Sequence, residues 1–114
     1  MKYFRLKKQA DFQKLFAKGN RAFSPSLTVV YKPSDKPYFG VSVGKRHGKS
    51  VQRNRIKRLL REAFRAVVNE TPFQKNYVIV LVPKVKEEYS FSTFKKHLQC
   101  IVKKNNFWRC AFGI

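Results

Sequence analysis

A helical apolar pattern and a dense positive charge coincide in one segment, Gly44 to Arg65, which reads GKRHGKSVQRNRIKRLLREAFR. Nine of its residues are Lys or Arg, and Glu62 is its single acid. Gly44 and Gly48 interrupt the first part, which predicts a loop. From Ser50 onward the sequence predicts a helix, with Ser50 as its N-cap. One face of this helix is apolar and consists of Ile56, Leu59, Leu60, Ala63, Phe64 and Val67.

A second arc of the same helix is basic. It carries Asn54, Lys57, Arg58, Arg61 and Arg65, with Arg53 and Arg55 at the edges of the apolar arc. A charged helix face is often only solvated, but this face has almost no acids at i±4 to offset its self-repulsion. Arginine dominates it, and the guanidinium fork suits phosphate. The basic loop in front of the helix adds Lys45, Arg46 and Lys49. We therefore predict that this surface binds a polyanion.

The net charge supports a polyanionic partner for the chain as a whole. Twenty-six Lys and Arg against six Asp and Glu leave +20 in 114 residues, the length of one small domain. Such a charge lowers folding stability through self-repulsion, so RNA, DNA or an anionic membrane is the expected partner. The membrane is the weakest of the three, because no apolar run approaches the roughly 20 residues of a spanning helix. Two cysteines make no disulfide framework, which favours the reducing cytoplasm.

The N-terminal half predicts one helix followed by strands. Lys7 to Lys18 forms the expected helix, with an apolar stripe of Phe12, Leu15 and Phe16. Three short runs then read as strands that pair antiparallel across short connections. These runs are residues 21–23, 27–32 and 38–43.

The C-terminal half adds a strand and a helix. Residues 76–82 are apolar almost throughout, which predicts a strand covered on both faces. Ser90 is the expected cap of a last helix that begins near Phe91. The resulting order, α-β-β-β-α-β-α, predicts a single α+β domain over residues 1–104 with helices packed on a sheet. Residues 105–114 form an aromatic tail without a predicted structure.

The segment RNRIKRLLREAFR from Arg53 to Arg65, preceded by SVGKR at Ser42 to Arg46, resembles the signature of the bacterial ribonuclease P protein subunit. The resemblance covers roughly residues 3–104. It implies a mixed central sheet of the ribosomal protein S5 domain 2-like type. It also implies a left-handed β-α-β crossover through the long helix, against the strong right-handed preference of such units.

The resemblance further implies an accessory subunit of a ribonucleoprotein endoribonuclease in the cytoplasm. In that family a catalytic RNA subunit, which holds Mg²⁺, removes the 5′ leader from precursor tRNA, and one protein per RNA is expected. Carried onto this sequence, the RNA-subunit-binding residues are Lys45, Arg46, Lys49, Arg53, Asn54, Arg55, Lys57, Arg58, Arg61 and Arg65. The leader would lie in a cleft between the first helix and the sheet. It would contact Lys8, Phe12, Phe16 and Tyr31, while Leu15 packs in the core.

No catalytic or metal-binding residues are predicted in the chain itself. The six carboxylates are scattered, whereas two-metal nucleases need carboxylates that converge. His97, Cys100 and Cys110 match zinc-ligand spacings poorly. Charge and size alone also fit a non-enzymatic RNA-binding protein, such as a small ribosomal protein, or a DNA-architectural protein. Neither alternative predicts the RNRIKRLLREAFR segment.

Overall fold

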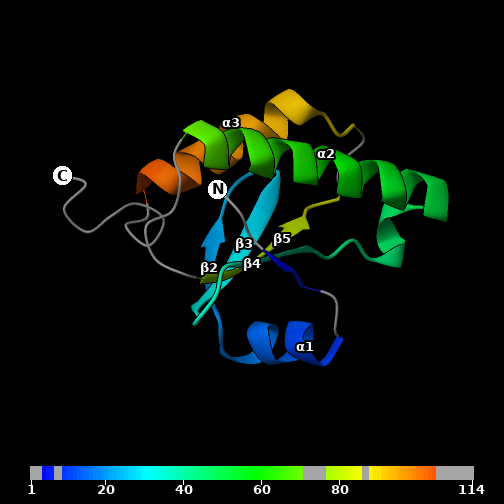
Figure 1. Cartoon of the computed structure of the whole chain (residues 1–114). Coiled ribbons are helices and arrows are strands. Elements are labelled where there is room, and N and C mark those ends of the chain that lie inside the picture. The colour runs from blue at the N-terminus through cyan, green and yellow to red at the C-terminus, as the bar shows by residue number, and fades with distance from the viewer. Residues whose placement is uncertain (1–3, 7–8, 71–76, 86–87, 105–114) are drawn as a thin grey trace.

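The computed structural model describes residues 4–6, 9–70, 77–85 and 88–104. They form one mixed sheet with helices on both faces (Figure 1). In chain order the elements are β1 (Phe4–Arg5), α1 (Gln9–Lys18), β2 (Asn20–Phe23), β3 (Leu27–Pro33), β4 (Tyr38–Val41), a 3-10 helix (Lys45–His47), α2 (Ser50–Glu70), β5 (Tyr77–Pro83) and α3 (Phe91–Lys104).

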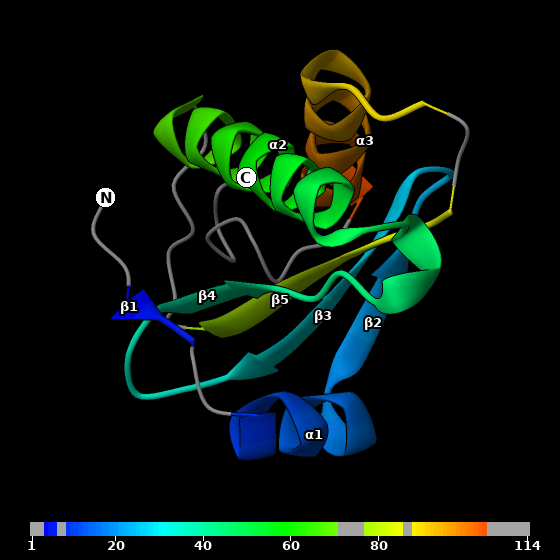
Figure 2. The ribbon, with the colours of Figure 1, turned by 90° about the vertical axis from the view of Figure 1, so that its right-hand side faces the viewer.

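The elements form three layers. Helices α2 and α3 lie on one face of the sheet, and α1 lies on the opposite face (Figure 2). The strand order is β1-β4-β5-β3-β2, in which β4 runs parallel to both β1 and β5, and β3 runs antiparallel to β5 and β2. The predicted α+β class and mixed sheet are thereby confirmed. Helix α2 connects two parallel neighbours, β4 and β5, and so forms a β-α-β unit.

Two strand predictions need correction. The β2–β3 hairpin forms as expected, but β3 and β4 are not neighbours, because β5 lies between them. Strand β5 is buried at most positions on both faces, so the central place in the sheet suits it best. In addition, the predicted order begins with the first helix, whereas the short strand β1 precedes that helix and extends the sheet beyond β4.

The larger hydrophobic core lies between the sheet and the two helices α2 and α3. The apolar face of α2 is buried there as predicted, and the ring of Phe64 stacks on that of Phe39 at a centroid distance of 3.9 Å. Phe94 and Leu98 of α3 are almost inaccessible in the same cluster. A smaller core on the other face joins α1 to the sheet and consists of Leu6, Leu15, Val30 and Val80.

The ends of the helices are held by polar contacts. Ser90 caps α3 as predicted, since its Oγ accepts a hydrogen bond from the backbone amide of Thr93 at 3.2 Å. Ser50 does not cap α2 but is its first residue; its Oγ accepts a guanidinium hydrogen bond from Arg53 at 3.3 Å. At the other end of α2, the carboxylate of Glu70 forms a salt bridge with Lys95 at 2.8 Å. It also accepts a hydrogen bond from the side-chain amide of Gln99 at 2.7 Å. These contacts join α2 to α3.

Candidate nucleic-acid interface

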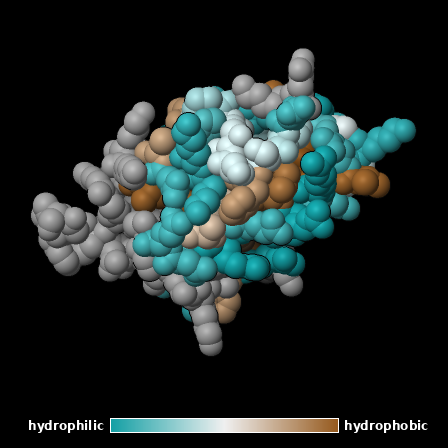
Figure 3. All heavy atoms as spheres, turned by 90° about the horizontal axis from the view of Figure 1, so that it is seen from above, coloured by the Kyte–Doolittle hydropathy of each residue, from teal (hydrophilic) through white to brown (hydrophobic). Residues whose placement is uncertain are grey.

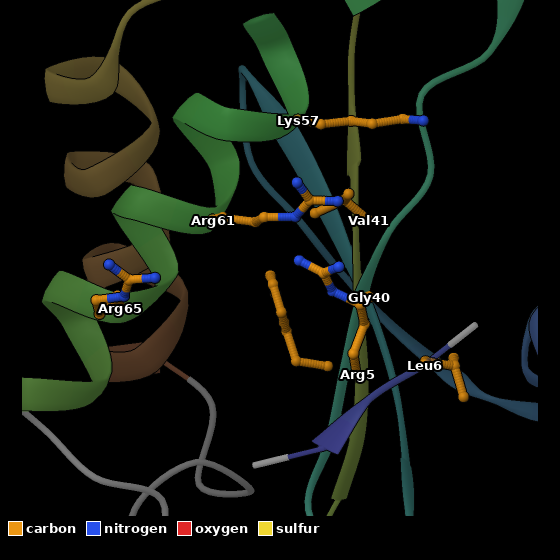
Figure 4. A pocket seen from close by; sticks show the side chains of 8 residues that line it. Arg5, Leu6, Gly40, Val41, Lys57, Arg61 and Arg65 are labelled. Carbon is orange, nitrogen blue, oxygen red and sulfur yellow. The ribbon is translucent and has the colours of Figure 1, made fainter. Parts of the chain in front are cut away.

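The basic arc of α2 faces an open hollow of about 280 Å³ between α2 and the β1–β4 edge of the sheet (Figure 4). Lys57, Arg61 and Arg65 extend into it from α2, and Arg5 extends from β1. Its floor is formed by Phe39, Gly40 and Val41 of β4 together with Leu6. No Asp or Glu belongs to the described lining of this hollow, so four cations share it without a neutralising acid.

Electrostatic repulsion within the hollow is visible at Arg61. This side chain is half-buried, and the pKa of its guanidinium is lowered first by burial and then by the nearby charge of Arg5. An arginine remains protonated despite such a shift, so the two positive charges persist side by side. A phosphate would relieve this repulsion and accept hydrogen bonds from the guanidinium forks. The hollow is therefore suited to the backbone of a nucleic acid.

Arg5 is a member of this cluster that the sequence did not indicate. It reaches the hollow only because β1 pairs in parallel with β4, which places Arg5 opposite Phe39. A two-residue strand is too short to show a periodic pattern, and no other signal in the sequence marks it.

The remaining predicted RNA-subunit-binding residues extend the positive surface beyond the hollow. Seven of the ten are exposed: Lys45, Arg46, Lys49, Asn54, Arg55, Arg58 and Arg65. Arg53, Lys57 and Arg61 are half-buried. Seen from above α2 and α3, the molecule is largely hydrophilic with a narrow apolar band across it (Figure 3). The structure thus brings Lys57, Arg61 and Arg65 together, and leaves the other residues spread along α2 and its preceding loop.

His47 anchors the basic loop to the body of the protein, a role that the sequence did not indicate. It is only 6% exposed, and its Nδ1 lies 2.8 Å from the hydroxyl of Tyr89. Burial and the charge of Arg46 lower the pKa of this imidazole, while a backbone hydrogen bond with Pro83 raises it. Gly48 follows with φ of 114°, a conformation that favours glycine, and leads the chain into α2.

The opposite face of the sheet carries the second predicted surface. Leu15 of α1 is buried in the smaller core, as predicted, whereas Phe12 and Phe16 are half-buried against it. Their rings lie 6.5 Å apart, and the Phe12 ring rests over Gly40. The two aromatic side chains are therefore partly open to a ligand beside α1. Lys8 lies outside the described residues.

The placement of Tyr31 in the same cleft is wrong. Its side chain packs against the larger core, on the face covered by α2 and α3, and meets the ring of Tyr77 edge-on at 6.1 Å. Successive residues of a strand point to opposite faces. Val30 occupies the α1 side, so Tyr31 necessarily faces away from Phe12 and Phe16.

Comparison with known proteins identifies the family. The family model for ribonuclease P matches residues 1–106. The chain belongs to the ribonuclease P protein family. Membership makes it a protein component of the tRNA-processing endoribonuclease. Among its relatives, the ribonuclease P protein component of Bacillus pumilus is 39% identical over 109 residues, covering 89% of this chain and 87% of the relative. The ribonuclease P protein component of Clostridioides difficile is 33% identical over 105 residues, which cover 89% of this chain and 90% of the relative.

Solved ribonuclease P proteins share the fold. The RNase P protein of Staphylococcus aureus superposes with a TM-score of 0.77 at 27% identity, over 95% of this chain and 100% of that one. The RNase P protein of Thermotoga maritima gives a TM-score of 0.75 at 28% identity, over 89% of this chain and 96% of that one.

The metal-ligating side chains that the structure describes are dispersed. Nowhere in the described part of the chain do three His, Cys, Asp or Glu side chains gather to hold a metal ion. His97 is engaged with the hydroxyl of Ser26 at 2.5 Å, and Cys100 is an exposed thiol. Within the same residues, no helix is long and apolar enough to cross a membrane.

Proposed function

We propose that this chain binds the catalytic RNA subunit of ribonuclease P through α2 and its preceding loop, and the single-stranded 5′ leader of precursor tRNA beside α1. The observation that carries the proposal is the four-cation hollow between α2 and β1, in a member of the ribonuclease P protein family. Like charges gathered without an acid favour a polyanionic ligand. Phosphate contacts of this kind fix position and orientation rather than sequence.

The RNA-subunit-binding surface consists of the loop and helix residues together with Arg5. Exposed side chains such as Arg55 and Arg58 are free to reach phosphates of a folded RNA, and Lys45 and Arg46 extend the same surface along the loop. His47 and Gly48 hold that loop against the body of the protein. The loop therefore needs little reorganisation on binding, which favours affinity.

The leader-binding surface uses the partly open rings of Phe12 and Phe16. Stacking on aromatic rings tolerates any base and contributes about 1–3 kcal/mol per base. This property suits leaders of varied sequence. Lys8 remains a predicted contact for the leader backbone. The two RNA surfaces lie on opposite sides of the sheet, so the protein can hold both ligands at once.

Catalysis belongs to the RNA subunit in this proposal. In this proposal Mg²⁺ is held mainly by that RNA. The protein contributes affinity and positioning, which raise the rate by orienting the substrate. One protein per RNA subunit is the stoichiometry that we propose.

Phe16→Ala tests the leader-binding surface. We expect the variant, assembled with the RNA subunit, to bind precursor tRNA about 1–3 kcal/mol more weakly, since one stacking face is lost. Binding of mature tRNA, which lacks the leader, is expected to stay unchanged. Equilibrium binding of both labelled RNAs measures the difference.

A matched control for this experiment is Phe91→Ala, which shortens a half-buried phenylalanine on the other face of the sheet. Both variants lose packing, but only Phe16 adjoins α1 and its proposed ligand. Equal losses for precursor and mature tRNA in Phe16→Ala, or equal effects of the two variants, would remove the cleft from the proposal.

A further inference from the structure

A row of side chains crosses the sheet beside α1. The backbone register aligns Phe4 of β1 with Tyr38 of β4, Tyr38 with Val78 of β5, and Val78 with Lys32 of β3. Residues opposite one another in neighbouring strands place their side chains on the same face. These four residues therefore form one continuous row, and we refer to its aromatic end, Phe4 and Tyr38, as the aromatic shelf.

The aromatic shelf lies on the α1 face of the sheet. Tyr38 and Val78 both pack against the smaller core that α1 covers. The next row along the strands contains Gly40, over which the ring of Phe12 rests. Two residues along a strand correspond to about 6.6 Å. The shelf is thus the row next to Phe12, at the edge of the sheet.

The shelf is open to solvent and is flanked by positive charge. Phe4 is 54% exposed, and its ring lies 5.7 Å from that of Tyr38 at an angle of 43°. The ammonium group of Lys36 lies over the Phe4 ring at 5.5 Å from its centroid. Lys32 is exposed at the far end of the row. In the loop between these lysines, the carboxylate of Asp35 accepts a hydrogen bond from Ser34.

We propose that the aromatic shelf stacks a base of single-stranded RNA, and that Lys36 and Lys32 bind the adjoining phosphates. This inference rests on the proposed leader-binding function and extends it from Phe12 to the sheet edge. Exposed aromatic rings combined with a cationic groove are what sequence-tolerant binding of single strands requires. When a base stacks on the Phe4 ring, the ammonium group of Lys36 moves from the ring to a phosphate, which neutralises its charge better than the ring does.

The same observations disfavour a peptide as the ligand. Strand β1 has two residues, which offers too few free backbone groups for a peptide to add as a further strand. Paired aromatics with a lysine at each end of the row instead match the negative backbone and the flat bases of RNA. The proposed ligand is therefore a single-stranded stretch of RNA that continues from the leader-binding surface beside α1.

Phe4→Ala and Phe4→Trp test the shelf in the protein assembled with the RNA subunit. Two precursor tRNAs serve as probes, one with a leader too short to pass Phe12 and one with a long leader. We expect Phe4→Ala to weaken binding of the long-leader precursor about fivefold or more, which corresponds to the lower end of one base stack. Binding of the short-leader precursor is expected to stay unchanged. Phe4→Trp, which retains a stacking face, is expected to bind the long leader at least as tightly as the parent protein.

Phe23→Ala is the matched control. Phe23 is likewise an exposed phenylalanine on an edge strand with a lysine, Lys84, over its ring, but it lies at the opposite edge of the sheet. The shelf is contradicted if Phe4→Ala and Phe23→Ala have the same effect while Phe16→Ala still weakens leader binding. If Phe16→Ala also shows no dependence on the leader, the proposed leader-binding function fails, and the shelf fails with it.

Discussion

Gly40 shows how the absence of one side chain positions α1. A Cβ atom at this residue would lie 2.9 Å from Cζ of Phe12 and 3.2 Å from Cβ of Leu6. The first distance is shorter than van der Waals contact, so the Phe12 ring would have to move. That ring is half-buried between α1 and the sheet, so its movement disturbs the packing of α1 on the sheet.

We expect Gly40→Ala to lower the free energy of unfolding by about 1–3 kcal/mol, the usual cost of overpacking. Gly44→Ala is the control, because nothing lies within 4 Å of its Cβ position and its φ of −79° suits any residue. It is expected to change stability by no more than about 0.5 kcal/mol. Chemical denaturation measures both variants. Similar stabilities for the two would show that Phe12 does not rest on Gly40.

His47 gives the fold a pH dependence of defined sign. Burial lowers its pKa in the folded protein below the ordinary value of 6.5, so the unfolded chain binds the proton more tightly. Neutral His47 therefore contributes its full stabilisation at pH values above 6.5. This contribution is lost as the pH falls below 6.5 toward the lower pKa of the folded protein.

Unfolding free energies measured from about pH 7 to about pH 5 are expected to decrease, partly because of His47. In His47→Gln this part of the decrease in unfolding free energy should disappear. The slope with pH is the decisive quantity, since the substitution itself also affects stability. An unchanged slope would mean that His47 titrates as an exposed imidazole.

Helix α2 combines two separate tasks on two faces. Its apolar face supplies Ile56, Leu60 and Phe64 to the larger core, and its basic arc faces the hollow and solvent. The 3.6-residue period predicts both faces from the sequence, because each is long enough to repeat.

Arg58→Ala tests the basic arc of α2. Arg58 is exposed, and loss of one phosphate contact should reduce the slope of log binding constant against log salt by about one. The measurement is a salt titration of binding to the RNA subunit. Lys96→Ala, an exposed cation of α3, removes the same charge from outside the arc and should leave the slope nearly unchanged. Equal changes in both variants would mean that only net charge matters.

The strands were less predictable than the helices. Alternation along β3 shows that Val30 and Tyr31 face opposite sides, but it does not show which side α1 covers. The alternation therefore leaves the face of Tyr31 undetermined, and its side chain lies on the face of the larger core. Local sequence also favoured pairing of β3 with β4, whereas the strongly apolar β5 takes the place between them. Contacts between segments distant in sequence determine both the face that α1 covers and the strand that pairs with β3. The sequence of one strand therefore does not reveal either.

The sheet divides the protein into two surfaces that face different ligands in our proposal. The α+β class follows from the order of the predicted helices and strands, and the family follows from the specific RNRIKRLLREAFR segment. The cation cluster at the hollow and the aromatic shelf do not follow from it, because each depends on β1. Arg5 and Phe4 point to opposite sides of that short strand and thus serve the two surfaces separately.

Reconstitution tests the central proposal most directly. The purified protein would be mixed with a bacterial ribonuclease P RNA at low Mg²⁺, and cleavage of a labelled precursor tRNA would be followed over time. We predict that the protein alone is inert, that the RNA alone cuts poorly, and that the mixture removes the 5′ leader efficiently. A protein that binds both RNAs without supporting cleavage would contradict this function and leave only a structural RNA-binding role.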